Sequence, residues 1–491
     1  MFQSLLKILL LPAIALAAAV RWFGNASMAA RIAWIVALFQ CVVVALAVAV
    51  VLWTGDRSVF QSWWSPWKAI ALLLLLFLVP VLVHQAARLW LERQDGRWGD
   101  IAAAWEAAVA ELGRQQISLT DSPVFLVLGS DGGAAERSLF AEAPSALVVE
   151  QSPAGGGPLH LFACRDAIFV CVSGAGQTAA MALHSPVAGT PPVGSPGDSD
   201  AGHGVGVAGT VNLGDDDHRA STGKPQPSAK DRRLATQRLE FACDLIRQAR
   251  VPLAAVNGVV VLLPLQMGHP ADADSPILGQ AVGEDLATIT RVLGVRAPVT
   301  FIAGVLQDDP AIDDLLGRID AGKRGTACGQ AFPVGLQPTV EHLRALSLNA
   351  TGSLGDHLTD LLLDSRRIAE QPANRHLLAL LLRLRLHVST QLYHVLKQAF
   401  LPDLHAPADG GPGALPLLAG CYLASIPGDA RRRAFVGEVL ARVVQLQGEL
   451  DWTDESLRSE AWARRTSRLL FATVAVMVVT MAAIIWWKMS R

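Results

Sequence analysis

The fold of this chain is set by the stretch Asp121–Phe140, DSPVFLVLGSDGGAAERSLF. Its apolar run Pro123–Leu128 predicts a buried strand, and a glycine turn then leads into the start of a helix. This order is typical of phosphate-binding loops of the pattern G-x-x-x-x-G-K-[ST], in which backbone N–H groups at a helix N-terminus hold phosphates. We therefore expect an α/β domain with this turn at the edge of its sheet.

The charged chemistry of such a loop is missing. When the pattern starts at Gly129, its second glycine falls on Ala134, its lysine on Ala135 and its hydroxyl residue on Glu136. A carboxylate there would repel a phosphate by about 4 kcal/mol at roughly 4 Å and an effective dielectric constant of about 20. We predict no bound cofactor, no metal and no catalytic residue. The degenerate loop consists of Gly129, Gly132, Gly133, Ala134, Ala135 and Glu136.

Strands and helices alternate after this stretch. Apolar runs at 167–172, 258–265 and 298–303 predict three further strands, and continuous apolar strands between helices indicate a parallel sheet covered on both faces. The predicted fold class is thus a P-loop-NTPase-like, mostly parallel sheet. A nucleotide hydrolase also needs an acidic residue after the strand at 167–172 and, in the GTPase branch, a T-K-x-D motif after the strand at 298–303. The sequence has Ser173–Gly176 and Gly304–Gln307 there, so it predicts a pseudo-NTPase. The alternative interpretation of the glycine turn is that it is an ordinary turn in a sheet that never bound a nucleotide.

Three apolar stretches predict membrane-spanning helices at about 32–53, 67–87 and 469–487. All 13 tryptophans lie within 22–105 or 452–487, and tryptophan favours membrane interfaces. Arginines flank the spans on one side, which the positive-inside rule assigns to the cytoplasm. The sequence thus predicts a multi-pass protein of the bacterial inner membrane with its main domain in the cytoplasm.

The remaining boundaries follow from composition. Residues 1–28 predict an interfacial helix, with a spanning helix or a cleaved signal peptide as alternatives. A membrane hairpin at 29–90 and a stalk helix at 91–120 are expected next. The α/β domain then covers 121–330 and contains a Gly/Pro/Ser-rich disordered insert at 185–233. A helical subdomain at 331–465 and a last membrane span at 469–487 complete the expected chain.

Charge and cysteines exclude other classes. A net charge of −2 provides no basic footprint for nucleic acid. The six cysteines form no C-x-x-C pair, so we expect reduced thiols instead of a disulfide framework or a metal site.

Several short segments resemble the IcmF/TssM family, the inner-membrane core proteins of type VI secretion systems. They are SPVFLVLG at 122–129, similar to the family's P-W-Y-L-V-L-G; NGVVV at 257–261, similar to L-N-G-V-V-V; LGVRAPV at 293–299, similar to R-L-G-V-R-F-P-V; and GCYLAS at 420–425, similar to R-G-V-Y-F-T-S. The resemblance runs in order from about residue 29 to the end. The family's G-K-[ST], D-T-A-G and T-K-x-D residues are absent, so no nucleotide-site residue carries over.

The resemblance implies a non-enzymatic scaffold subunit whose pseudo-NTPase domain docks other subunits. The implied partners are a small inner-membrane protein of the DotU/TssL type and baseplate components, within an oligomer. The family's large periplasmic region is not matched, which puts contact with an outer-membrane lipoprotein in question. The alternative function is a nucleotide-binding switch, a GTPase or ATPase with an atypical phosphate loop in which Arg137 supplies the missing cation.

Overall fold

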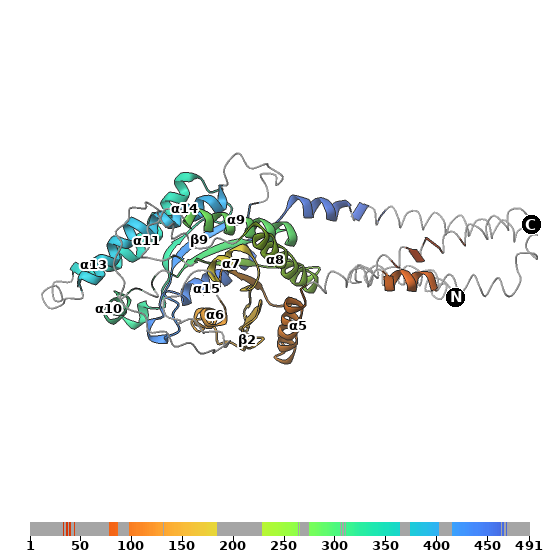
Figure 1. Cartoon of the computed structure of the whole chain (residues 1–491), viewed down its shortest axis with the longest axis horizontal. Coiled ribbons are helices and arrows are strands. Elements are labelled where there is room, and N and C mark those ends of the chain that lie inside the picture. Colours follow the sequence, from red (N-terminus) through yellow and green to blue (C-terminus); the bar gives the residue numbers. More distant parts are fainter. Residues whose placement is uncertain are drawn as a thin grey trace, which may run out of the picture. The chain divides into compact units, whose positions relative to one another are not determined.

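The structure is a computed structural model of the chain (Figure 1). It describes residues 98–130, 132–183, 228–263, 274–304, 311–363, 374–401 and 415–462, together with 78–86 and a few single residues. The chain forms two compact units, one of residues 103–453 and one of residues 1–102 with 454–491. In the latter, residues 78–86 and 454–462 are helical. All the elements described below belong to the unit of residues 103–453. Its first helix, α5 (Gly99–Arg114), has its first turn just before the start of that unit.

An eight-stranded sheet forms the centre of this unit, in the order β2-β3-β4-β1-β5-β7-β9-β8. Strands β4, β1, β5, β7 and β9 run parallel to one another, while β3 runs antiparallel to β4 and β8 runs antiparallel to β9. The strands are β1 (Val124–Leu128), β2 (Val149–Ser152), β3 (His160–Ala163), β4 (Ile168–Cys171), β5 (Gly258–Leu263), β7 (Pro298–Ala303), β8 (Cys328–Ala331) and β9 (Leu417–Leu423).

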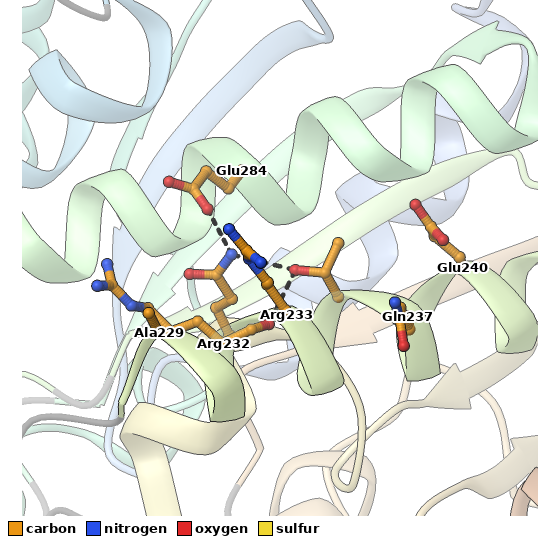
Figure 2. Close-up of a pocket in the computed structure, with 8 residues that line it drawn as sticks. Ala229, Arg232, Arg233, Gln237, Glu240 and Glu284 are labelled. Atoms are coloured by element: carbon orange, nitrogen blue, oxygen red, sulfur yellow. Dashed lines mark hydrogen bonds between the residues drawn. The ribbon is translucent and has the colours of Figure 1, made fainter.

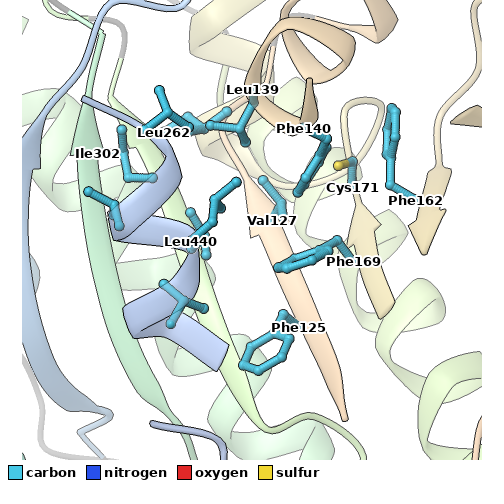
Figure 3. Packing of buried hydrophobic residues seen from close by; sticks show 14 of the residues in the cluster. Phe125, Val127, Leu139, Phe140, Phe162, Phe169, Cys171, Leu262, Ile302 and Leu440 are labelled. Atoms are coloured by element: carbon cyan, nitrogen blue, oxygen red, sulfur yellow. The ribbon is translucent and has the colours of Figure 1, made fainter. Parts of the chain in front are cut away.

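Helices cover both faces of the sheet. On one face, α6 (Gly133–Phe140) and α15 (Gly437–Gln445) pack on a core that includes Phe125 and Phe169 (Figure 3). Successive strand residues point to opposite faces. Ile302 belongs to this core, whereas its neighbour Phe301 packs edge-on against Phe400 of α14, so α14 lies on the opposite face.

The second face carries several long helices and one short one. They are α7 (Gln177–Leu183), α8 (Ala229–Arg250), α9 (Asp274–Leu293), α11 (Val340–Leu363) and α14 (Ser389–Phe400), with α9 packed against α14, α8 and α7. Smaller elements complete the unit: β6 (Val295–Arg296) pairs with β10 (Asp451–Trp452), α10 (Ala311–Arg318) follows β7, and α13 (Asn374–Arg383) continues through a π-helical turn (Leu384–Val388) into α14.

Four of the expected strands lie where the apolar runs placed them, at β1, β4, β5 and β7. The sheet is nevertheless mixed. Two short hairpin connections make β3 antiparallel to both of its neighbours, and β8 joins the far edge in the antiparallel sense. The range 331–465, expected to be a helical subdomain, contributes the buried strand β9 between β7 and β8.

The predicted insert 185–233 lies largely outside the described residues. Helix α8 begins inside its last part, at Ala229, after an N-cap at Ser228. The Ser228 side chain accepts from the backbone N–H of Asp231, and the Asp231 side chain accepts from the backbone N–H of Ser228. This capping box explains the early start, since it pairs two backbone donors that the first turn leaves free.

The predicted membrane topology is corrected. Among the residues that the structure describes, no helix is long and apolar enough to cross a membrane. The long helix α8 is an example of a helix that could not span a membrane. Its sequence AKDRRLATQRLEFACDLIRQAR carries charges on most turns, and it buries only one face. This finding overturns the predicted fold class of a membrane protein and the predicted inner-membrane location. The interfacial helix at 1–28 and the span at 469–487 lie outside the described residues, and so does most of the span at 32–53. Of the span at 67–87, the structure describes residues 78–86, which are helical.

Candidate functional site

The degenerate loop lies at the carboxyl end of β1, in the middle of the parallel strands. In open α/β sheets this is the edge where ligands bind, at the point where the strand order reverses. Strand β1 has β4 on one side and β5 on the other, so the chain reverses its direction of travel here. Gly129 has a φ of +76°, and a Cβ there would collide with the carbonyl oxygen of Leu262. Only glycine fits this turn, as the sequence predicts.

A buried carboxylate occupies the mouth of this loop. Glu136 lies in the first turn of α6 and is fully buried. Its Oε1 accepts a hydrogen bond from Ser130 Oγ at 2.6 Å. Its Oε2 lies 2.7 Å from Nδ1 of His160 on β3, within ion-pair distance but outside regular hydrogen-bond angles. The helix N-terminus that would attract a phosphate therefore already faces a carboxylate of the chain itself.

The surroundings of Glu136 exclude water. His160 is also fully buried, and its Nε2 lies 3.0 Å from the carbonyl oxygen of Gly155, to which it donates. Burial, and secondly the negative charge of Glu136, raise the pKa of the Cys171 thiol well above its ordinary value. Cys171 is therefore a packed thiol and offers no nucleophile.

Arg137, the cation of the alternative hypothesis, has another partner. Its guanidinium donates to the side-chain oxygen of Gln151 on β2. Gln151 is buried, and its amide nitrogen donates in turn to the carbonyl oxygen of Gly155 at 2.7 Å. This pairing holds α6 to β2, and Gln151 itself lies directly against Gly133 of the loop.

The strand end where a magnesium-binding aspartate would be expected follows β4. Ser173 stands there, and its hydroxyl donates to the carbonyl oxygen of Gly157 at 3.2 Å. A Cβ on Gly174 would overlap Pro158, so the chain packs closely at this point. The loop after β4 is therefore filled by neighbouring backbone.

The next helix, α7, is capped by a carboxylate from a different helix. Asp285 of α9 accepts from the backbone N–H groups of Gln177 at 2.9 Å and Thr178 at 2.8 Å, and from Thr178 Oγ1 at 2.7 Å. It is fully buried, and this desolvation raises its pKa to about 6, against the opposing effect of the three hydrogen bonds. No sequence pattern indicates this contact, because more than a hundred residues separate its two sides.

The base-reading position follows β7. Here Asp309 caps the start of α10 by accepting from the backbone N–H of Ala311 at 2.8 Å. Its other oxygen pairs with Arg383 of α13 at 2.9 Å, and Asp309 is buried while Arg383 is about one-third exposed. Arg432 donates to the Asp309 carbonyl oxygen at 3.2 Å. The Asp309 side chain therefore links the start of α10 to α13.

A polar pocket of about 380 Å³ lies beside α7, between α8 and α9 (Figure 2). The Gln177 amide donates to Thr236 Oγ1 at 3.1 Å and to Glu284 across the pocket floor. Its lining combines both charges and consists of Gln177, Ala229, Arg232, Arg233, Thr236, Gln237, Glu240 and Glu284. The sequence analysis missed this pocket, whose residues come from three separate helices.

These arrangements favour structural joints over catalysis. The predicted loop residues Gly129, Gly132, Gly133 and Glu136 do come together, with Ala134 and Ala135 on the first turn of α6. The sequence did not reveal His160, the partner of Glu136, or Asp285, which caps α7. Within the described ranges, no three His, Cys, Asp or Glu side chains lie close enough together to hold a metal ion.

Comparisons with known proteins give no relative. No protein-family model matches the chain, and neither does any curated protein or solved structure.

Proposed function

We propose that this chain is a non-enzymatic docking subunit, in which an NTPase-like α/β frame serves as a rigid platform for other proteins. The observation that carries the proposal is the carboxylate of Glu136, which fills the loop mouth together with Ser130 and His160. A phosphate could enter only by displacing a buried acidic group that already has partners.

Two further strand ends support the same function. Ser173 is bonded to backbone, and Asp309 is bonded to Arg383 and Ala311. Ser173 and Asp309, which follow the strands where a hydrolase would bind magnesium and a base, hold neighbouring segments together here. A platform of this kind keeps its shape without a ligand, which suits a docking role.

The resemblance to the IcmF/TssM family suggests the partners. We propose a DotU/TssL-type protein and baseplate components of a secretion complex as the proteins that dock on this unit. Affinity capture of the tagged full-length chain from its own cells, followed by identification of the co-purifying proteins, tests this. Recovery of such proteins is expected, and recovery of none of them would contradict the assignment of partners.

A thermal melt with magnesium and millimolar ATP or GTP tests the absence of nucleotide binding. A ligand at 100 times its Kd would add about 2.7 kcal/mol to the free energy of unfolding, which is easily detected. We expect no shift. A magnesium-dependent shift that the variant Arg137→Ala abolishes would instead establish the nucleotide-switch alternative.

A further inference from the structure

One helix of the unit presents apolar side chains to solvent on a continuous line. On α13 and the following π-turn, Leu378, Leu382 and Leu386 are 49%, 49% and 64% exposed. Residues on the other side of the same helix, among them Leu377 and Leu384, are fully buried. The helix therefore has two apolar faces, of which only one serves the core of this chain.

The π-turn straightens the exposed line. In an α-helix, residues four apart drift by about 40° around the axis, because a turn holds 3.6 residues. The π-turn Leu384–Val388 holds more residues per turn and covers the second half of the step from Leu382 to Leu386, so the drift over that step is smaller. Leu386 therefore stays close to the line of Leu382. Such turns occur frequently at functional sites.

Arginines mark both ends of this line. Arg375 lies one turn before Leu378 and Arg385 lies beside Leu386, and both are exposed. Neither has an ion-pair partner within the part of the chain that the structure describes, whereas Arg383 on the flank is paired with Asp309. The whole segment from Asn374 to Phe400 contains no Asp or Glu. We name the set Arg375, Leu378, Ala379, Leu382, Arg385 and Leu386 the leucine stripe.

We infer that the leucine stripe binds an amphipathic helix of a partner protein, one that has an apolar face and an acidic residue near each end. The apolar line fits the helix-in-groove or helix-on-helix mode of recognition, in which residues at four-residue spacing act as anchors. The two arginines, which have no ion-pair partner among the described residues, lie about 15 Å apart along the axis, at 1.5 Å per residue, and select for acidic groups at that separation. This inference rests on the proposed docking function and names the surface that performs it.

The test uses two fluorescent helical peptides and the purified full-length chain. Both peptides carry three leucines at four-residue spacing; the first has a glutamate beyond each end of its leucines, and the second has arginines there. Fluorescence anisotropy measures both affinities. We expect the acidic peptide to bind roughly tenfold more tightly than the basic one.

Two variants of the chain examine the stripe. Leu382→Glu should weaken binding of the acidic peptide by at least about tenfold, because it places a charge in the centre of the contact. The double change Arg375→Glu with Arg385→Glu should reverse the preference between the peptides. The matched controls Leu253→Glu and Arg165→Glu alter exposed residues elsewhere and should leave both affinities unchanged. Thermal midpoints equal to that of the parent chain confirm that each variant folds.

Three outcomes would overturn the inference. The first is no binding of either peptide by the parent chain, and the second is binding that the stripe variants do not change. The third is binding of anionic lipid vesicles that depends on Arg375 and Arg385 without any preference between the peptides. Failure here leaves the proposed function intact if nucleotide still gives no shift in the melt, whereas nucleotide protection would defeat the proposed function itself.

Discussion

Two helix starts at the same edge of the sheet hold buried carboxylates in different ways. At α6, Glu136 belongs to the helix itself and meets Ser130 and His160. At α7, Asp285 comes from α9 and binds two backbone N–H groups and a hydroxyl. Both helix starts are electropositive, and at the start of α6 a phosphate would bind in an active enzyme. In this chain a carboxylate of the protein itself occupies each start: Glu136 contacts the loop before α6, and Asp285 links α9 to α7.

The difference between the two sites lies in how well each carboxylate is satisfied. Asp285 receives three well-formed hydrogen bonds, whereas one oxygen of Glu136 depends on an ion-pair contact with His160. A carboxylate that is tied to backbone donors fixes a joint between two helices. A carboxylate that is tied to side chains fills a cavity and closes a loop.

The largest effect is expected from Glu136→Ala. The change removes a buried carboxylate and leaves His160 and the Ser130 hydroxyl facing a cavity. Breaking a buried pair in this way should lower the free energy of unfolding by about 3 kcal/mol. Urea unfolding followed by circular dichroism measures it.

The matched control is Glu150→Ala, at an exposed position on β2. It should change the free energy of unfolding by less than about 0.5 kcal/mol. Equal losses in the two variants would show that Glu136 has no special place in the loop.

The second effect is a pH dependence that belongs to Asp285. Its pKa is raised from 3.8 to about 6, so the folded chain holds this proton more tightly than the unfolded chain does. The contribution to stability is fully present below about pH 3.8 and is lost as the pH rises through about 6. It amounts to about 3 kcal/mol at most, at 1.36 kcal/mol per unit of pKa.

Unfolding free energies of the parent chain and of Asp285→Asn, measured from pH 4 to pH 7, isolate this contribution. Subtracting the two curves removes the titration of the other acids. The parent chain should lose stability relative to the variant as the pH rises across this range. A difference that stays constant with pH would show that Asp285 is ionised throughout.

A third effect concerns the hydroxyl that binds Asp285. Thr178→Val removes the 2.7 Å hydrogen bond to Oδ2 while keeping the shape of the side chain. A hydrogen bond to a charged group contributes about 2 kcal/mol, so we expect a loss of that order at pH 7. Thr178→Ser keeps the hydroxyl and should retain most of the stability in the same urea titration. A valine variant as stable as the serine variant would contradict the role of this bond.

The smallest effect is expected from Ser130→Ala in the other site. The change removes one donor to Glu136 Oε1 but leaves the contact with His160, so the loss should be about 1.5 kcal/mol. The control Ser145→Ala removes a hydroxyl that donates to Asp166 at 2.5 Å in an exposed position, where we expect almost no loss. If Ser130→Ala costs more than Thr178→Val, the order assigned to the two sites is wrong.

The sequence predicts the centre of the fold well, because β1, β4, β5 and β7 are continuous apolar runs. It fails at β2 and β3, which have four residues each and lack a long apolar pattern. Strand β9 escaped detection because glycine and cysteine interrupt it and helices surround it in sequence.

The candidate site also has one part that the sequence predicts and one part that it does not. Gly129 and Glu136 could be assigned from one local pattern, whereas their partners depend on tertiary structure. His160 reaches Glu136 only because β3 folds back beside β4, and Asp285 reaches α7 only through the packing of α9. An isolated histidine in the apolar strand HLFA was the one available indication, and a single residue of this kind does not identify its partner.

The position of β9 has a consequence for the synthesis of the chain. Strand β9 pairs with β7, Pro298 lying opposite Leu417, although several helices and β8 come between them in sequence. At about 5–20 residues per second, a ribosome completes β9 roughly 6–25 s after the start of β7. During that interval β7 has an unpaired edge on which no neighbour has yet been made, and open edges recruit other chains. The nascent protein must therefore be shielded for many seconds, by its own helices α11 and α14 or by a chaperone, before the sheet can close.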